Sequence, residues 1–279
     1  MELATEAAGR DHGMSGGQAK PHAEMLKLAL EVIALLGESC TRIAVGGSLR
    51  RGKKDIGDIE IICQPDFQPL PTAKGGFIRI KQNAVNWMCD SLRDQQIFQP
   101  RLNMTGNIEA WADRHKRAWY KGVKVDLFIV LPDRSWGYTM LLRTGPGDAN
   151  QALVTREGVY NREGNRGICP QPYEFRDGDL HVGEQRIETP EEKDVFAALG
   201  LPYIAPPLRS VEMYQRWAGR RVDPYPEEWL KLFESRARGW VGAPDYGNDV
   251  WLPGVVGRIE NQPQLLELVK REGEAQGAA

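Results

Sequence analysis

The sequence predicts an α+β protein whose sheet is mostly antiparallel. Apolar residues recur at helical spacing over residues 25–36, and Gly37 then ends the segment. Three short apolar segments have the composition of strands: residues 42–45, 58–63 and 123–130. Tight connections such as Lys121 and Gly122 join neighbouring segments, and tight connections favour antiparallel pairing.

The elements are expected in a definite order along the chain. The first helix is expected to begin at Pro21, since proline favours the first helical turn. The glycine-led segment at residues 46–52 is expected to be a turn between two strands. The spacing of apolar residues predicts a helix that begins at residues 77–80 and reaches Leu92. The remaining elements expected before residue 143 are strands at 99–104 and 117–120 and a helix at 135–142.

A glycine- and proline-rich break at residues 144–147 indicates the end of the first domain. Beyond it, Thr189 is expected to cap a helix that has Pro190 in its first turn and runs through Leu199. A final helix is expected at residues 262–272. The expected divisions are a disordered tail at 1–17, a first domain at 18–150, a second at 151–210 and a C-terminal extension of unknown role at 211–279.

The composition is that of a folded intracellular protein. Hydrophobic residues make up 41% and charged residues 27% of the 279 residues, and eight tryptophans are more than a disordered chain would carry. A net charge of -2 gives no overall attraction to nucleic acid, so any such binding depends on local basic segments. The four cysteines form no C-x-x-C pair, and free thiols are expected. No signal peptide or membrane span is predicted, so we expect a cytoplasmic monomer without membrane contact.

The first candidate site is the glycine-led turn that contains Gly47, Ser48 and Arg51. Glycine allows backbone N–H groups to approach phosphate oxygens closely, while a serine hydroxyl donates a hydrogen bond and an arginine supplies charge. The pattern is typical of a triphosphate-binding loop. An ordinary tight turn is the alternative.

The second candidate site is the pair of carboxylates Asp58 and Glu60, ten residues beyond the serine. Side chains two apart on a strand point to the same face, roughly 7 Å from each other. Oxygen ligands on a rigid strand suit Mg²⁺, which combines carboxylates with substrate phosphates. An exposed strand face with two charges is the alternative.

A third carboxylate, Asp126, stands at the head of the most apolar strand. A buried acid needs a counter-charge, because burial of an unpaired charge is costly. A metal ion would satisfy all three acids. A salt bridge to Arg117 or Lys124 is the alternative for this aspartate alone.

Taken together, these residues resemble the family X DNA polymerases, typified by DNA polymerase beta, within the nucleotidyltransferase superfamily. Ser48, Arg51, Asp58 and Glu60 match the family's serine, arginine and first two carboxylates without a gap, and Asp126 matches the third. Residues 131–150 are similar to the segment that joins the family's palm to its thumb, and residues 191–206 to the end of the thumb. The resemblance covers about residues 23–209.

The resemblance implies a nucleotidyltransferase palm, with a mixed, mostly antiparallel sheet and helices on one face, followed by a small thumb-like domain and the C-terminal extension. It implies transfer of a nucleotide from a nucleoside triphosphate to a 3'-hydroxyl with release of pyrophosphate, as in gap filling or primer extension during DNA repair or replication. The implied cofactors are two Mg²⁺ ions, with Mn²⁺ as an alternative, held by Asp58, Glu60 and Asp126. The implied nucleotide-binding residues are Gly47, Ser48, Arg51, Gly57, Arg143, Thr144, Gly145 and Asn150. The implied partner is gapped DNA or a DNA primer-template.

The sequence departs from the family in ways that leave alternatives open. Glu60 replaces an aspartate, and no N-terminal lyase domain is expected, because the chain has no room for one before residue 20. Acceptors other than DNA therefore remain alternatives: RNA, a protein or a small molecule. A non-catalytic nucleic-acid-binding relative is a further alternative. Three basic segments with tryptophan or histidine neighbours are candidate nucleic-acid contacts, or else solvated surfaces: residues 114–117, 216–221 and 236–238.

Overall fold

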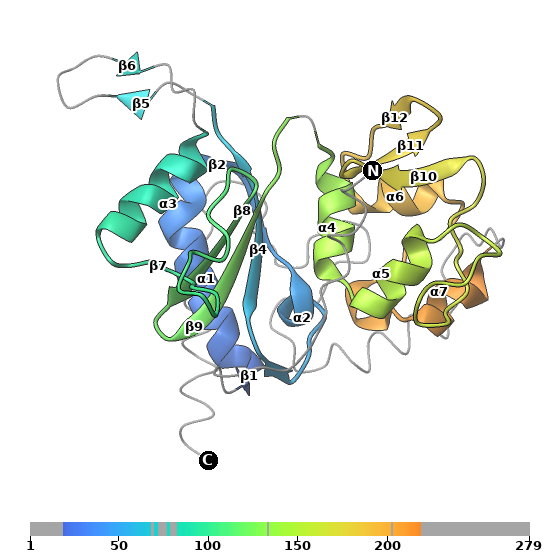
Figure 1. Ribbon diagram of the computed structural model, residues 1–279, viewed down its shortest axis with the longest axis horizontal. Coiled ribbons are helices and arrows are strands. Elements are labelled where there is room, and N and C mark those ends of the chain that lie inside the picture. The colour runs from blue at the N-terminus through green and yellow to red at the C-terminus, as the bar shows by residue number, and fades with distance from the viewer. Residues whose placement is uncertain are drawn as a thin grey trace. The chain divides into compact units, whose positions relative to one another are not determined.

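The chain forms two units, and each is described by itself. The computed structural model describes residues 19–67, 70–71, 77–78, 83–132, 134–201 and 203–218 (Figure 1). Among these, a sheet unit comprises residues within 19–49 and 54–131, and a helical unit comprises residues within 50–53 and 132–218. The expected tail at 1–17, the helix at 262–272 and most of the C-terminal extension lie outside the described residues.

The sheet unit is built on a five-stranded sheet in the order β2-β4-β9-β8-β7. Its strands are β2 (Cys40–Val45), β4 (Ile59–Pro65), β7 (Gln99–Pro100), β8 (His115–Tyr120) and β9 (Val123–Ile129). β4 and β9 run parallel, and the other neighbouring pairs are antiparallel. The predicted α+β class with a mixed, mostly antiparallel sheet is confirmed.

Two helices cover one face of this sheet. α1 (His22–Leu36) and α3 (Ala84–Asp94) contact β4 and each other, and Figure 1 shows them on the same side of the sheet. α1 buries the apolar stripe that the sequence predicts, including Leu26, Ala29 and Ile33. Pro21 stands just before the first helical residue, as the N-cap, one position earlier than expected.

The hairpin between β8 and β9 forms as the sequence predicts. Lys121 and Gly122 have φ values of 48° and 74°, and two positive values fit a two-residue turn whose twist matches that of the strands. The turn fixes the register, in which Arg117 pairs with Asp126. An arginine therefore lies directly beside the third expected carboxylate.

Two expectations about the sheet unit are wrong at the point where local polar side chains decide the geometry. The segment expected as a plain turn at 46–52 contains a helical turn, α2 (Gly47–Arg50). The strand expected at 99–104 ends at Pro100, because the Asn103 side chain accepts hydrogen bonds from the backbone N–H groups of Thr105 and Asn107, each at 3.0 Å.

The helix expected from residue 77 begins later. Its first residue is Ala84, where the Asn83 side chain caps it by accepting a hydrogen bond from Asn86 N at 2.7 Å. Phe77–Ile78 instead forms strand β6, which pairs with β5 (Leu70–Pro71). The remaining short elements of the unit are β1 (Lys20–Pro21), paired with β3 (Asp55–Ile56), and the 3-10 turn η1 (Gly37–Ser39).

The helical unit combines short helices with a three-stranded antiparallel sheet in the order β10-β11-β12. α4 contacts α6, and α5 contacts α7. The elements are α4 (Trp136–Thr144), α5 (Gly147–Val154), β10 (Tyr173–Arg176), β11 (Asp179–Val182), β12 (Gln185–Ile187), α6 (Glu192–Ala198), the 3-10 turn η2 (Pro206–Leu208) and α7 (Val211–Trp217).

The start of α6 differs from the prediction. Thr189 is fully buried and its carbonyl accepts a hydrogen bond from Gly137 N at 2.9 Å, so packing against α4 holds this residue outside the helix. The cap is Glu191, whose side chain accepts from the backbone of Asp194 while Asp194 accepts from Glu191 N. The helix therefore begins at Glu192.

The expected boundary between residues 150 and 151 falls inside α5, and the two units divide instead between Leu131 and Pro132. The predicted break at 144–147 corresponds to the short connection between α4 and α5. The thiols of Cys40, Cys63, Cys89 and Cys169 are free, as expected. None of the helices in the described ranges is both long and apolar enough to cross a membrane.

Candidate functional site

The three predicted carboxylates lie on two adjacent parallel strands of the sheet unit. Glu60 on β4 is in register with Asp126 on β9, and register partners on parallel strands project to the same face, with the strands about 4.8 Å apart. Asp58 stands immediately before β4, two residues from Glu60. Between them Ile59 is fully buried, whereas Asp58 and Glu60 are half-buried, as the alternation of a strand predicts.

Gly47 lies against the side chain of Glu60. A Cβ atom at this glycine would be 2.8 Å from Glu60 Cδ, and its φ of +60° is unfavourable for residues with side chains. The adjacent Gly46 N donates a hydrogen bond to the carbonyl of Glu60 at 2.8 Å. The glycine-led segment is thus built onto the carboxylate strand. Ser48 is half-buried on α2, while Gly57 is exposed and a Cβ there would meet no atom within 4 Å.

Asp126 is paired with two arginines of its own unit. Arg101 Nη1 donates to Asp126 Oδ1 at 2.9 Å, and Arg117 Nε lies 3.4 Å from Oδ2, an ion pair without hydrogen-bond geometry. Burial raises the pKa of the Asp126 carboxyl, the charges of Arg117 and Arg101 lower it in part, and the nearby charge of Asp58 raises it again. The influence of Asp58 shows that the two aspartates are close enough to interact.

The donor chemistry of Asp58, Glu60 and Asp126 fits a hard divalent cation, because all three offer carboxylate oxygens on one face of the sheet. The side-chain positions are not those of a formed metal centre. No group of three or more acidic, histidine or cysteine side chains is gathered around an ion position among the described residues. Two guanidinium groups instead supply positive charge to Asp126.

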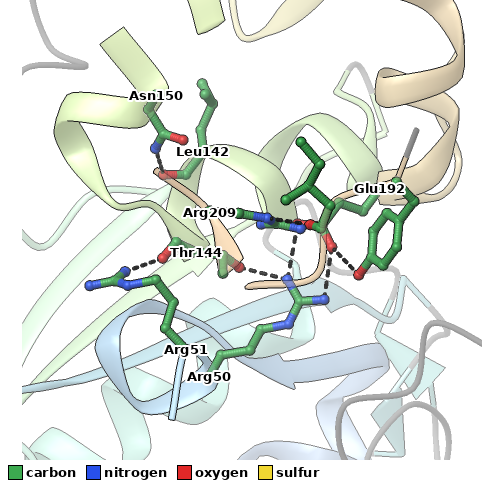
Figure 2. Close-up of polar contacts among 9 residues, drawn as sticks. Arg50, Arg51, Leu142, Thr144, Asn150, Glu192 and Arg209 are labelled. Carbon is green, nitrogen blue, oxygen red and sulfur yellow. Dashed lines mark hydrogen bonds and ion pairs between the residues drawn. The ribbon is translucent and has the colours of Figure 1, made fainter. Parts of the chain in front are cut away.

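The nucleotide-binding residues predicted near the end of the first domain belong to the helical unit, together with Arg51. Arg51 Nη1 donates a hydrogen bond to the carbonyl of Thr144 and lies against Gly145, where a Cβ would be 2.9 Å from this nitrogen (Figure 2). Asn150 is 9% exposed, and its Nδ2 donates to the Leu142 carbonyl at 2.7 Å. Its Oδ1 is buried without a hydrogen-bond partner among the described residues. Arg143, also predicted, is half-buried at the end of α4.

A buried ion network holds these residues in place. Glu192 lies between two arginines: Arg50 donates to both carboxylate oxygens at 3.0 and 2.8 Å, and Arg209 donates to Oε1 at 2.7 Å (Figure 2). Tyr203 OH donates to Oε2 at 3.1 Å, and Arg50 also donates to Thr144 Oγ1 at 2.7 Å. Burial alone would raise the pKa of Glu192, but the charges and hydrogen bonds of Arg209 and Arg50 lower it to about 2.

The matches to known proteins agree with this arrangement. Residues 152–210 match the family model of the DNA polymerase beta thumb, a range that lies within the expected thumb-like domain. The chain is also similar to DNA polymerase lambda of Rattus norvegicus, with 28% identity over 178 residues, which is 58% of this chain and 28% of that protein. The chain is a family X DNA polymerase-like protein. It spans less than a third of the length of this relative.

Several residues of this polymerase-like site were not predicted from the sequence. Arg117 follows from the hairpin register and was one of the two expected partners of Asp126, whereas Lys124 does not pair with it in the described structure. Arg101 and Glu192 act over separations of 25 and 142 residues, for which the sequence carries no local signal. The basic segment at 114–117 is less exposed than expected, because Lys116 is only 3% exposed and donates to the Ala112 carbonyl at 3.2 Å.

Proposed function

We propose that this polymerase-like chain transfers nucleotides from a nucleoside triphosphate to the 3'-hydroxyl of DNA, in gap filling or primer extension, and releases pyrophosphate. The observation that carries the proposal is the register of Glu60 with Asp126 on adjacent parallel strands, with Asp58 two residues before Glu60. This register puts three carboxylates on one face of a rigid sheet. The matches to the polymerase beta thumb and to DNA polymerase lambda support DNA as the acceptor.

Asp58, Glu60 and Asp126 are the residues that would hold two Mg²⁺ ions, or Mn²⁺ in their place. When bound, such ions stabilise the charge that develops on the attacking and leaving oxygens of an in-line displacement. The protein contributes position: β4 and β9 fix the backbone of the three acids, and the close approach of Gly47 fixes the Glu60 side chain.

We assign phosphate binding to Gly47, Ser48 and Arg51. Ser48 is a half-buried hydroxyl donor, and the hydrogen bond of Arg51 to the Thr144 carbonyl holds its guanidinium, which retains other N–H groups for a phosphate. The backbone at Gly145 and the side chain of Arg143 are further contacts in this assignment. Gly57 is retained as a weaker candidate, because open space surrounds it.

Asn150 is assigned to the base or sugar of the incoming nucleotide. A buried carbonyl oxygen that lacks a partner costs free energy, which a donor group of a ligand would recover. The side chain is already oriented by its hydrogen bond to the Leu142 carbonyl, so little conformational entropy is lost on binding.

The proposal is tested by incorporation of a labelled nucleotide in the presence of Mg²⁺. Four acceptors are compared: gapped DNA, single-stranded DNA, RNA and no acceptor. We expect incorporation on gapped or primed DNA. Incorporation on RNA alone, or into the protein itself, would reassign the acceptor, and a folded protein inactive with all four would contradict the proposed activity.

A further inference from the structure

Asp126 belongs to a closed ring of four alternating charges. Arg101 contacts Asp126 Oδ1 at 2.9 Å and Glu109 Oε2 at 3.0 Å. Arg117 contacts Asp126 Oδ2 at 3.4 Å and Glu109 Oε1 at 3.1 Å. Each arginine therefore has two acidic partners, and each acid has two basic partners.

The backbone holds three members of the ring independently of Asp126. Arg101 N donates to the Arg117 carbonyl at 3.0 Å, and Glu109 N donates to the Arg101 carbonyl at 2.8 Å. Arg117 N donates to the Ala110 carbonyl at 2.9 Å. The two arginines and Glu109 therefore stay together when the contacts to Asp126 are lost.

These contacts affect how strongly Asp126 attracts another cation. A carboxylate has about four lone-pair positions, so two guanidinium contacts leave room for a further ligand bond. The electrostatic effect is larger than the steric one, because two positive charges beside Asp126 repel an approaching divalent ion. Glu109 offsets part of that repulsion, since it contacts both arginines at 3.0–3.1 Å.

We propose that Arg101 and Arg117 compete with the divalent cation for Asp126, and that Glu109 sets the strength of this competition by holding both arginines. The proposal rests on the proposed function, in which Asp126 is a metal ligand. When the cation binds, the arginines retain Glu109 as their acidic partner. Glu109, Arg101 and Arg117 are in this sense positioning residues, which act on the metal through Asp126.

The proposal makes opposite predictions for two single charge changes that leave all three candidate ligands intact. Arg101→Gln or Arg117→Gln removes a positive charge and tightens Mn²⁺ binding. Glu109→Gln removes a negative charge and weakens it. At low ionic strength each change is about tenfold, because a unit charge about 6 Å from a divalent ion contributes about that factor even in water.

The experiment measures Mn²⁺ binding to the full chain without nucleotide, by electron paramagnetic resonance of the free ion. Lys20→Gln and Glu24→Gln are matched controls, because they remove the same charges from an exposed ion pair of the same unit. Arg101→Lys and Arg117→Lys retain the charge and should bind Mn²⁺ nearly as the wild type does. Circular dichroism establishes that each variant is folded, and Asp126→Asn establishes that the bound ion depends on this aspartate.

Tighter binding in both arginine-to-glutamine variants and weaker binding in Glu109→Gln supports the competition. Binding that appears only in the arginine-to-glutamine variants supports it as well. If the wild type binds Mn²⁺ through Asp126 but these variants bind it equally or less tightly, the competition is refuted and the proposed function stands. If neither the wild type nor any folded variant binds Mn²⁺, both proposals are overturned.

Discussion

Replacement of Glu192 by glutamine is expected to destabilise the protein strongly, although it changes the shape of the side chain very little. The carboxylate accepts hydrogen bonds from Arg50 at 3.0 and 2.8 Å and from Arg209 at 2.7 Å, and all three side chains are at most 3% exposed. Glu192→Gln leaves two guanidinium charges buried without their common counter-charge. Loss of one partner from a buried ion pair costs about 3–5 kcal/mol.

The assay is urea unfolding followed by circular dichroism, with the free energy of unfolding compared between variants. Glu184→Gln is the matched control, because this carboxylate is 95% exposed and lies 3.3 Å from Arg176 in the same unit. The control is expected to change the free energy of unfolding by less than about 0.5 kcal/mol. A Glu192→Gln protein within about 1 kcal/mol of the wild type would refute the view that this network holds the helical unit together.

Three further predictions concern the same residues and the glycine-led segment. Because the pKa of Glu192 is lowered to about 2, its stabilising contribution is complete above its ordinary pKa of 4.5 and is lost as the pH falls toward 2; acid unfolding should be flatter over that window in Glu192→Gln, and an unchanged profile would contradict the assignment. Gly47→Ala should lower both stability and activity, because its Cβ would be 2.8 Å from Glu60 Cδ, whereas Gly57→Ala, with no atom within 4 Å, should unfold as the wild type does; equal thermal stability of the two variants would argue against the close approach. Arg51→Ala should raise the apparent KM for the triphosphate more than that for the acceptor strand, and triphosphate binding that is unchanged by titration with Mg²⁺ would remove Arg51 from the site.

Local patterns predicted those parts of the fold that depend on local interactions. The apolar stripe of α1 and the turn at Lys121 and Gly122 are encoded within a few residues, so both could be read from the sequence. The hairpin then determines the pairing of Arg117 with Asp126. The start of α6 was missed, because packing against α4 rather than local capping excludes Thr189 from the helix.

The candidate site divides in the same way. The spacing of Asp58 and Glu60 on one strand predicts that they share a face, and the structure adds that Asp126 is in register with Glu60. Neither Arg101 beside Asp126 nor Glu192 beside Arg50 has a sequence pattern that indicates it, since each contact depends on how distant segments pack. The sequence therefore indicated which acids to consider, while their counter-charges required the three-dimensional structure.

The most direct test of the central claim compares Asp58→Asn, Asp126→Asn and Asp55→Asn in nucleotide incorporation on gapped DNA under single-turnover conditions. Asp55 is an exposed carboxylate only three residues before Asp58, so it controls for loss of negative charge in this region. We predict a loss of at least about a hundredfold for Asp58→Asn and Asp126→Asn, as is usual for loss of a preorganised electrostatic group, and a rate near that of the wild type for Asp55→Asn. Wild-type rates in a folded Asp58→Asn or Asp126→Asn protein would contradict the claim that these carboxylates carry the reaction.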